Sequence, residues 1–197
     1  DSGKVTLDAG NDIYLGQFNN YADIYADGDI TLTAGEDITV DAYTYVESLS
    51  GDISFDAGNN INLITRVEGE ETWISADNGN LSLNADNDIN ITGGTETYSS
   101  DDTEMTAGNV IQALGYIEAG GTADIKAEEN VTVADINATD ISITSNNASI
   151  LDDGDDTTVL SATGTITLTA NTDIGSTDGE AGIRPGFIDI DTTNLSD

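Results

Sequence analysis

A short motif recurs along the whole chain, and this repetition restricts the possible folds more than any other feature of the sequence. Repeats of this kind are typical of proteins in which similar units stack and bury a shared core between neighbours. The strongest copies begin at Gly3, Gly28, Gly51 and Gly79 and read GKVTLDAGNDIYL, GDITLTAGEDITV, GDISFDAGNNINL and GNLSLNADNDINI. Weaker copies bring the number to nine and begin at Asp101, Gly121, Thr139, Gly164 and Gly186.

Apolar and polar residues alternate within each copy, as they do around Val5 and Leu7 in the first. Alternation over so short a stretch predicts a half-buried β-strand rather than a helix. The residues expected to point inward form two columns down the copies. Small polar residues lie between these columns and are expected to face solvent: Thr6, Thr31, Ser54, Ser82, Ser142 and Thr167.

A small residue such as Ala9 or Ala34 follows the second apolar column, and a glycine often comes next. This pair predicts a corner, because glycine adopts backbone torsions that other residues avoid. A second short strand is expected to start soon after the corner, at Ile13 and Ile38 in the first two copies. A segment of variable length then closes each copy.

Strand, corner, strand and closing segment together describe one coil of a parallel β-helix. The spacing of the copies is too short for a propeller blade, which needs about 40–45 residues. Parallel crossovers are right-handed in nearly all known cases. The sequence therefore predicts one all-β domain over residues 1–197, a right-handed parallel β-helix (β-solenoid) of about nine coils with three short strands in each.

The charge of the chain is strongly one-sided, with 38 acidic residues against 4 basic ones and a formal net charge of −34. So few basic residues cannot form the positive surface that nucleic acid requires. Self-repulsion of this size favours a medium in which salt or calcium screens the charge. The chain has no Cys and no His, which excludes disulfides and zinc sites of the Cys/His kind. It also lacks an apolar run of about 20 residues, so membrane insertion is not expected.

Acidic residues precede the second strand of several copies, at Asp12, Asp37, Asp88 and Asp173, with Asn60 and Asn130 interrupting the row. Stacked coils would place these side chains in a line. Two interpretations remain open. The side chains could bond the backbone of the turns, as Asp and Asn often do, or carboxylates in the row could be bridged by calcium, which prefers oxygen ligands.

The densest acidic cluster lies in a variable segment and contains Asp152, Asp153, Asp155 and Asp156. It allows the same two interpretations, a solvated loop or a calcium site. Calcium is the only cofactor that the sequence suggests.

Aromatic residues gather in the variable segments of successive copies: Tyr21, Tyr43, Tyr45, Trp73, Tyr98 and Tyr116. If the coils stack, these side chains could share one face. They could cover the third strand of each coil, or they could form a surface for sugars or for a lateral contact between subunits, where Tyr and Trp are favoured.

The motif G-[DN]-[ILV]-x-[LF]-x-A-[GD]-[NE]-[DN]-I-x-[LV], which the copies at Gly3, Gly28, Gly51 and Gly79 follow closely, resembles a known repeat. It is similar to the haemagglutinin-type repeats of large bacterial exoproteins, the filamentous-haemagglutinin class exported by two-partner secretion. The resemblance implies a β-helical shaft that is secreted or displayed on the cell surface and acts in adhesion.

The repeat continues to both ends of the sequence, so we expect an extracellular structural protein whose coils stack end to end on further copies of itself. The product would be a homopolymeric filament, sheath or surface layer. One alternative is the shaft of a secreted adhesin, with carbohydrate or a cell surface as partner. Another is a polysaccharide-active β-helix enzyme. No catalytic residues and no enzymatic activity are predicted, because the basic residues are few and the acidic ones do not converge.

Overall fold

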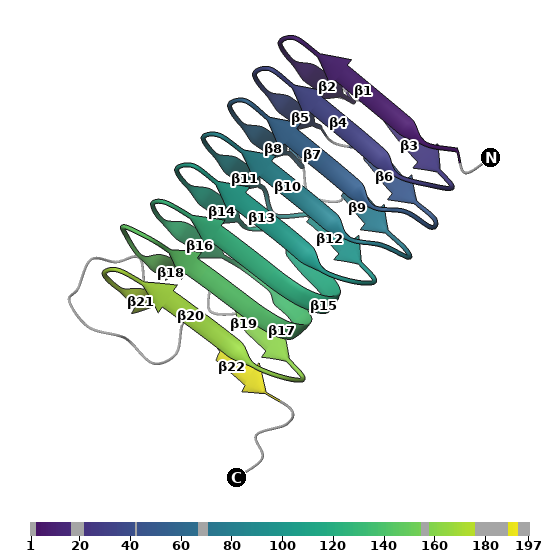
Figure 1. Ribbon diagram of the computed structural model, residues 1–197. Helices are drawn as coiled ribbons and strands as arrows, with labels where there is room; N and C mark the ends of the chain where they lie inside the picture. Colours follow the sequence, from purple (N-terminus) through teal and green to yellow (C-terminus); the bar gives the residue numbers. More distant parts are fainter. Residues whose placement is uncertain are drawn as a thin grey trace.

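Short strands stack on one another to form a β-solenoid, with β1 (Val5–Ala9) at one end and β20 (Ile166–Ala170) at the other (Figure 1). The computed structural model describes residues 3–16, 22–41, 43–66, 71–154, 158–175 and 189–192, the last range by its backbone alone. The described strands pair in parallel. The predicted all-β parallel solenoid is confirmed, and its right-handed coiling stays a prediction.

The first strands of the coils form one column. Val5 lies opposite Ile30, and Ile30 lies opposite Ile53, so equivalent residues of successive copies share a row. Side chains alternate in direction along a strand, which turns the apolar residues inward and the small polar ones outward. The predicted rows are therefore confirmed from Val5 to Ile166 and from Leu7 to Leu168. This column contains β1, β4 (Ile30–Ala34), β7 (Ile53–Ala57), β10 (Leu81–Ala85), β13 (Thr103–Ala107), the second parts of β15 (Tyr116–Ala127) and β17 (Ile136–Ser145), and β20.

The second strands are shorter and form an 8-stranded sheet of their own. Apolar residues at the two ends of most of these strands point inward, as Ile38 and Val40 do in the second coil. The column contains β2 (Ile13–Leu15), β5 (Ile38–Val40), β8 (Ile61–Leu63), β11 (Ile89–Ile91), β14 (Ile111–Ala113), β16 (Val131–Val133), β18 (Ile150–Asp152) and β21 (Ile174–Gly175).

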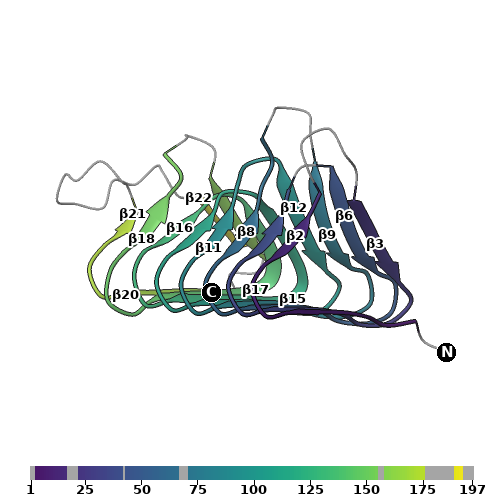
Figure 2. The ribbon, with the colours of Figure 1, turned by 90° about the horizontal axis from the view of Figure 1, so that it is seen from above.

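The third strands close the coils, and the three columns lie on different sides of the solenoid (Figure 2). They share a 14-stranded sheet with the first column, because β15 and β17 run through both. The register of β15 shifts between Ala119 and Thr122. A Cβ atom on Gly120 would lie 2.0 Å from the carbonyl oxygen of Ser100, so glycine permits this close approach. The column contains β3 (Ala22–Ala26), β6 (Thr44–Ser48), β9 (Thr72–Ala76), β12 (Thr95–Ser99), the first parts of β15 and β17, β19 (Val159–Ala162) and β22 (Asp189–Thr192).

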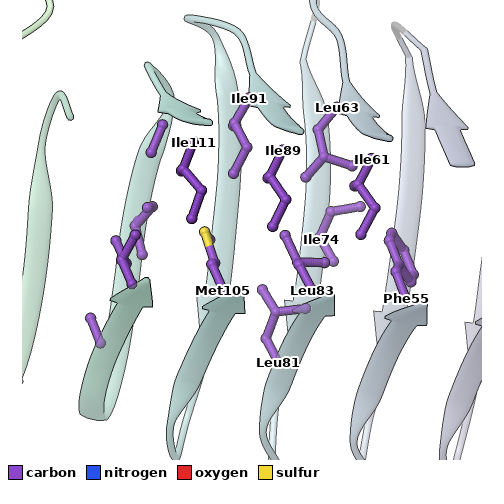
Figure 3. Close-up of a cluster of buried hydrophobic side chains, with 14 of the residues drawn as sticks. Phe55, Ile61, Leu63, Ile74, Leu81, Leu83, Ile89, Ile91, Met105 and Ile111 are labelled. Atoms are coloured by element: carbon purple, nitrogen blue, oxygen red, sulfur yellow. The ribbon is translucent and has the colours of Figure 1, made fainter. Parts of the chain in front are cut away.

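The core is a narrow stack of apolar rows that runs along the solenoid. Phe55, Leu83 and Met105 occupy successive positions of one row and are fully buried. Figure 3 shows them together with Ile61 and Ile89 of the second column. Each coil needs only a thin apolar stripe, because its neighbours cover it on both sides. This explains how a chain with few aromatic residues builds a continuous core.

The ninth predicted copy is not a new coil. The sequence predicts that Ile190 belongs to the second inward row of the first column, in a copy that starts at Gly186, which itself lies outside the described residues. That prediction is wrong, because β22 pairs with β19 and Ile190 lies opposite Leu160 in the third column. More residues separate β21 from β22 than separate these strands in other coils, and the spacing of copies cannot reveal such an extension. Each column stacks eight strands, and the seven steps between them correspond to about seven turns of the solenoid.

Candidate functional site

The residues before the second strand form a hydrogen-bonded row, which we call the second-strand ladder. Oδ1 of Asp12 accepts a hydrogen bond from the backbone N–H of Asp37 at 3.1 Å. Oδ1 of Asp37 accepts one from the backbone N–H of Asn60 at 3.0 Å. The same step joins Asp88 to Val110 and Asn130 to Ser149, each at 3.1 Å. The members are Asp12, Asp37, Asn60, Asp88, Asn130, Ser149 and Asp173.

Asparagine side chains reinforce this ladder. Asn59 and Asn60 donate their side-chain amides to Oδ1 of Asp37 at 2.8 and 3.0 Å, so that one carboxylate oxygen accepts three hydrogen bonds. Asn109 donates in the same way to Asp88 at 2.8 Å. Hydrogen bonds to a charged acceptor are stronger than neutral ones, so these contacts stabilise the ladder. Bonding to the turn backbone, one of the two interpretations of the row, is thus seen directly.

The arrangement of side chains in the second-strand ladder does not identify a calcium site. No group of three or more acidic side chains gathers into a metal site within the described part of the chain. The backbone N–H of Asp173 donates to Oγ of Ser149 at 3.3 Å, so Asp173 also belongs to the hydrogen-bonded row. The bridging of calcium by Asp12, Asp37, Asp88 and Asp173 stays a prediction.

A second row of the same kind, which we call the first-strand ladder, was not predicted from the sequence. Its members precede the first strand of each coil: Asp29, Asp52, Asn80, Asp102, Thr122, Asp140 and Thr165. The backbone N–H of Asn80 donates to Oδ1 of Asp52 at 2.8 Å, and that of Thr122 donates to Oδ1 of Asp102 at 2.7 Å. The Asp or Asn that follows the first glycine of the motif could have indicated this ladder.

The acidic cluster after β18 is only partly described. Asp152 is buried, and its Oδ1 accepts a hydrogen bond from the backbone N–H of Gly154 at 2.8 Å. Oδ1 of Asp153 accepts one from the hydroxyl of Thr158 at 2.9 Å. Asp155 and Asp156 lie outside the described residues. A calcium ion held by this cluster therefore stays a prediction.

Three side chains from successive coils meet around a buried carboxylate. Asp41 is 1% exposed, and Arg66 donates Nε to its Oδ1 and Nη2 to its Oδ2, both at 2.7 Å. Tyr14 donates its hydroxyl to the same carboxylate. The hydrogen bond with Asp41 raises the pKa of Arg66 and also raises the pKa of Tyr14. This cluster joins the first three coils, and because its members lie in different copies no motif in the sequence indicates it.

The aromatic residues share the outer side of the third column, and we call this surface the aromatic face. Tyr45 lies opposite Trp73, which confirms the expected clustering. Acidic residues alternate with the aromatic ones, since Tyr98 lies opposite Glu118 and Tyr116 opposite Glu96. Tyr43 precedes β6 with a φ of 58° and is not part of these rows, and Tyr21 lies outside the described residues. The members are Tyr25, Tyr45, Trp73, Tyr98 and Tyr116.

Shallow grooves flank the aromatic face. One groove of about 300 Å³ is lined by Tyr116, Asp135, Ile136, Asn137, Val159 and Ser161. Its single carboxylate, Asp135, accepts a hydrogen bond from the backbone N–H of Val159 at 2.8 Å. A second groove of similar volume lies beside β1 and includes Lys4, Tyr25 and Leu49. Neither lining contains the pair of carboxylates that glycoside hydrolysis commonly uses.

The two end coils differ from the rest in burial. Val5 and Leu7 at one end, and Ile166 and Leu168 at the other, are only partly buried, whereas their counterparts Ile30 and Leu32 are 0% exposed. No described strand pairs with the outer edge of β1 or with that of β20. Both ends of the described solenoid therefore present apolar side chains beside unpaired strand edges.

Comparison with known proteins gives no relative. No protein-family model matches the chain, and neither does any curated protein or any solved structure. The β-solenoid fold is established by the strand pairing, while the relation to haemagglutinin-type repeats stays a prediction. No described segment forms a helix of the length and hydropathy needed to cross a membrane.

Proposed function

We propose that this chain is an extracellular structural protein, a β-solenoid subunit that assembles end to end on copies of itself into a filament, sheath or surface layer. The observation that carries the proposal is the contrast between the end coils and the middle coils. The same row of apolar residues is fully covered inside the solenoid and partly open at both ends.

Covering these ends is favourable for two reasons. Removing apolar surface from water contributes about 25 cal/mol for each Å² that is buried. An uncovered strand edge also presents unpaired N–H and C=O groups, which are a template for pairing with another chain. A second copy that stacks on an end coil satisfies both requirements.

A contact between the two different ends of identical subunits does not close on itself. Each added subunit leaves one new end of each kind, so the assembly grows in one dimension. Light scattering and electron microscopy of the purified chain over a range of concentrations test this function. We expect rods whose length increases with concentration. Single short rods at every protein and calcium concentration would overturn the proposal.

The surface charge sets the conditions for assembly. A formal net charge of −34 on each subunit opposes both end-to-end and sideways contacts. Salt screens exposed charges over about 8–10 Å at ionic strengths near 0.1 M, so assembly should increase with salt. We include calcium in the proposal as the cation that reduces repulsion along the acidic surface, because carboxylate oxygens are its preferred ligands.

A second candidate function is the shaft of a secreted adhesin, and the aromatic face favours it. Tyr and Trp side chains combine an apolar ring with a polar group, which suits them to contacts with sugars and with other proteins. The proposed partner is a carbohydrate or a cell surface. This role is tested by comparing how the wild-type chain and a Tyr45→Ala, Trp73→Ala variant bind immobilised polysaccharides. Equal binding by both would exclude the aromatic face as the binding surface.

A further inference from the structure

The contact between β4 and β7 provides a pattern for how two coils fit. β4 has the sequence ITLTA and β7 has the sequence ISFDA. They pair in parallel with Ile30 opposite Ile53, Leu32 opposite Phe55 and Ala34 opposite Ala57. Thr33 lies opposite Asp56 on the outer face.

The two ends of the solenoid carry the same pair of sequences. β20 is ITLTA, identical to β4, and β1 is VTLDA, which has the apolar, small polar and acidic residues of β7 at the same positions. If β20 of one copy lay on β1 of the next, Ile166 would meet Val5, Leu168 would meet Leu7 and Thr169 would meet Asp8. Each of these pairs combines the same kinds of residue as the corresponding pair between β4 and β7, apolar with apolar or Thr with Asp.

A glycine at the start of the solenoid points to the same contact. A Cβ atom on Gly35 would lie 2.2 Å from the carbonyl oxygen of Gly10 in the coil above, and one on Gly58 would lie 2.5 Å from that of Gly35. Glycine thus permits close stacking at this corner. A Cβ atom on Gly10 would have nothing within 4 Å, so no described coil requires glycine at this position. A neighbouring subunit stacked above Gly10 would require it.

The second-strand ladder also continues across such a contact. In its steps other than the one from Val110 to Asn130, a backbone N–H donates to the side chain one coil earlier, as Asp37 does to Asp12. In the joined subunits, the N–H of Asp12 would meet the carboxylate of Asp173. Thr165 would lie in the row of Lys4. Among the rows of the first two columns, only the one that joins Asp173 to Asp12 pairs two acidic residues, and in the third column Asp189 would lie opposite Asp23.

From these observations we infer that subunits join head to tail in one register: β20 of one copy pairs in parallel with β1 of the next, with Ile166 opposite Val5, and Asp173 accepts a hydrogen bond from the backbone N–H of Asp12. The inference rests on the proposed function and specifies its partner surface. A head-to-head contact would instead set two β1 strands antiparallel and would break every row.

Engineered cysteines test the register, because the chain has no cysteine of its own. Thr6 and Thr167 are exposed and would lie opposite each other in the proposed contact. Neighbouring strands are about 4.8 Å apart, which suits the 4.4–6.8 Å between the Cα atoms of a disulfide. We expect a chain with Thr6→Cys and Thr167→Cys to give a ladder of covalent multimers under mild oxidation.

Two control variants make the result specific. Thr6→Cys with Thr169→Cys shifts one partner by two residues, or about 6.6 Å along the strand, and should stay largely monomeric on denaturing gels. Thr6→Cys with Thr31→Cys joins Cα partners within one chain and should form an internal disulfide. Multimers from the shifted pair, or dimers from Thr6→Cys alone, in samples that still form rods would overturn the register and leave the proposed function intact. Absence of rods in the wild-type chain would overturn both.

A glycine pair provides an independent test that does not depend on cross-linking. Gly10→Ala adds a methyl group where the described chain leaves open space, so unfolding of the subunit should be unchanged while the concentration needed for assembly rises at least about tenfold. Gly35→Ala adds the same group inside the solenoid and should destabilise the subunit itself. Assembly of Gly10→Ala at the wild-type concentration would contradict the inference.

Discussion

β4 and β20 have the same five residues, ITLTA, but they lie in different surroundings. In β4, which has a coil on each side, Ile30 and Leu32 are fully buried. In β20, which has a described coil on one side only, Ile166 and Leu168 are partly exposed. Since the local sequence is identical, the difference in burial comes entirely from the neighbouring coil. The stability of this protein therefore depends on contacts between coils as much as on the interactions within each coil.

The largest expected effect comes from deleting the same side chain in both strands. Leu32→Ala removes a fully buried side chain and should lower the free energy of unfolding by about 3 kcal/mol, whereas Leu168→Ala should cost about 1.5 kcal/mol because part of the cavity is open to solvent. Urea denaturation at low protein concentration and low salt measures both. Thr31→Ala and Thr167→Ala, which alter outward residues of the same strands, are the matched controls. Equal losses for the two leucine variants would remove the distinction between middle and end coils.

A smaller difference should separate two members of the second-strand ladder. Oδ1 of Asp37 accepts three hydrogen bonds, whereas a single one is described for that of Asp12 in the end coil. Asp37→Ala should lower the free energy of unfolding by about 2 kcal/mol and Asp12→Ala by about 1 kcal/mol. Asp37→Asn keeps an acceptor oxygen and should lose less than Asp37→Ala. A larger loss of unfolding free energy for Asp12→Ala than for Asp37→Ala would show that the number of hydrogen bonds does not determine which residue stabilises the protein more.

Removal of calcium should have a modest effect spread along the acidic rows. At low salt, EDTA is expected to lower Tm by about 3 °C, which corresponds to about 1 kcal/mol for a chain of this size. Thermal unfolding followed by circular dichroism, with and without added calcium, measures the change. An unchanged Tm would rule out calcium bridging in both the ladders and the Asp152–Asp156 cluster. Recovery with magnesium alone would indicate screening rather than a calcium site.

The smallest effect is expected for the exposed ion pair between Lys4 and Asp29, which joins the end coil to the next. The hydrogen bond with Lys4 lowers the pKa of Asp29, and the same contact raises the pKa of Lys4. The stabilisation is thus present between the ordinary pKa values of the two groups, near 4 and 10.5. It is lost as pH falls through the lowered value of Asp29 or rises through the raised value of Lys4.

Lys4→Gln should therefore shift the unfolding midpoint slightly at pH 7, and the shift should shrink as the pH falls below about 4. Arg66→Gln is the comparison inside the first three coils, where Asp41 is buried, and should lower the midpoint more. Unfolding curves of both variants across pH give the test. A shift by Lys4→Gln that stays constant as the pH falls would show that lost packing, not charge, is responsible.

The rows of the solenoid could be predicted because the alternation that defines them is local and repeated in every copy. Val5, Ile30 and Ile53 were aligned correctly for that reason. The closing strands have no such pattern, so the position of Ile190 was predicted wrongly and Tyr25 was not included in the aromatic face. The cluster of Tyr14, Asp41 and Arg66 combines residues from different positions of three copies, so no repeated pattern in the sequence indicates it.

The ladders also imply an order of folding. Each ladder N–H that donates to a ladder side chain donates to one that comes earlier in the sequence, as from Asp37 to Asp12 and from Asn80 to Asp52. A finished coil thus offers preformed side-chain acceptors to the residues that follow it, while its own backbone N–H groups, such as that of Ile30, donate to carbonyls of the next coil. A chain released with its N-terminus first would find its next template already in place at every step, so that the solenoid can lengthen one coil at a time as the chain emerges.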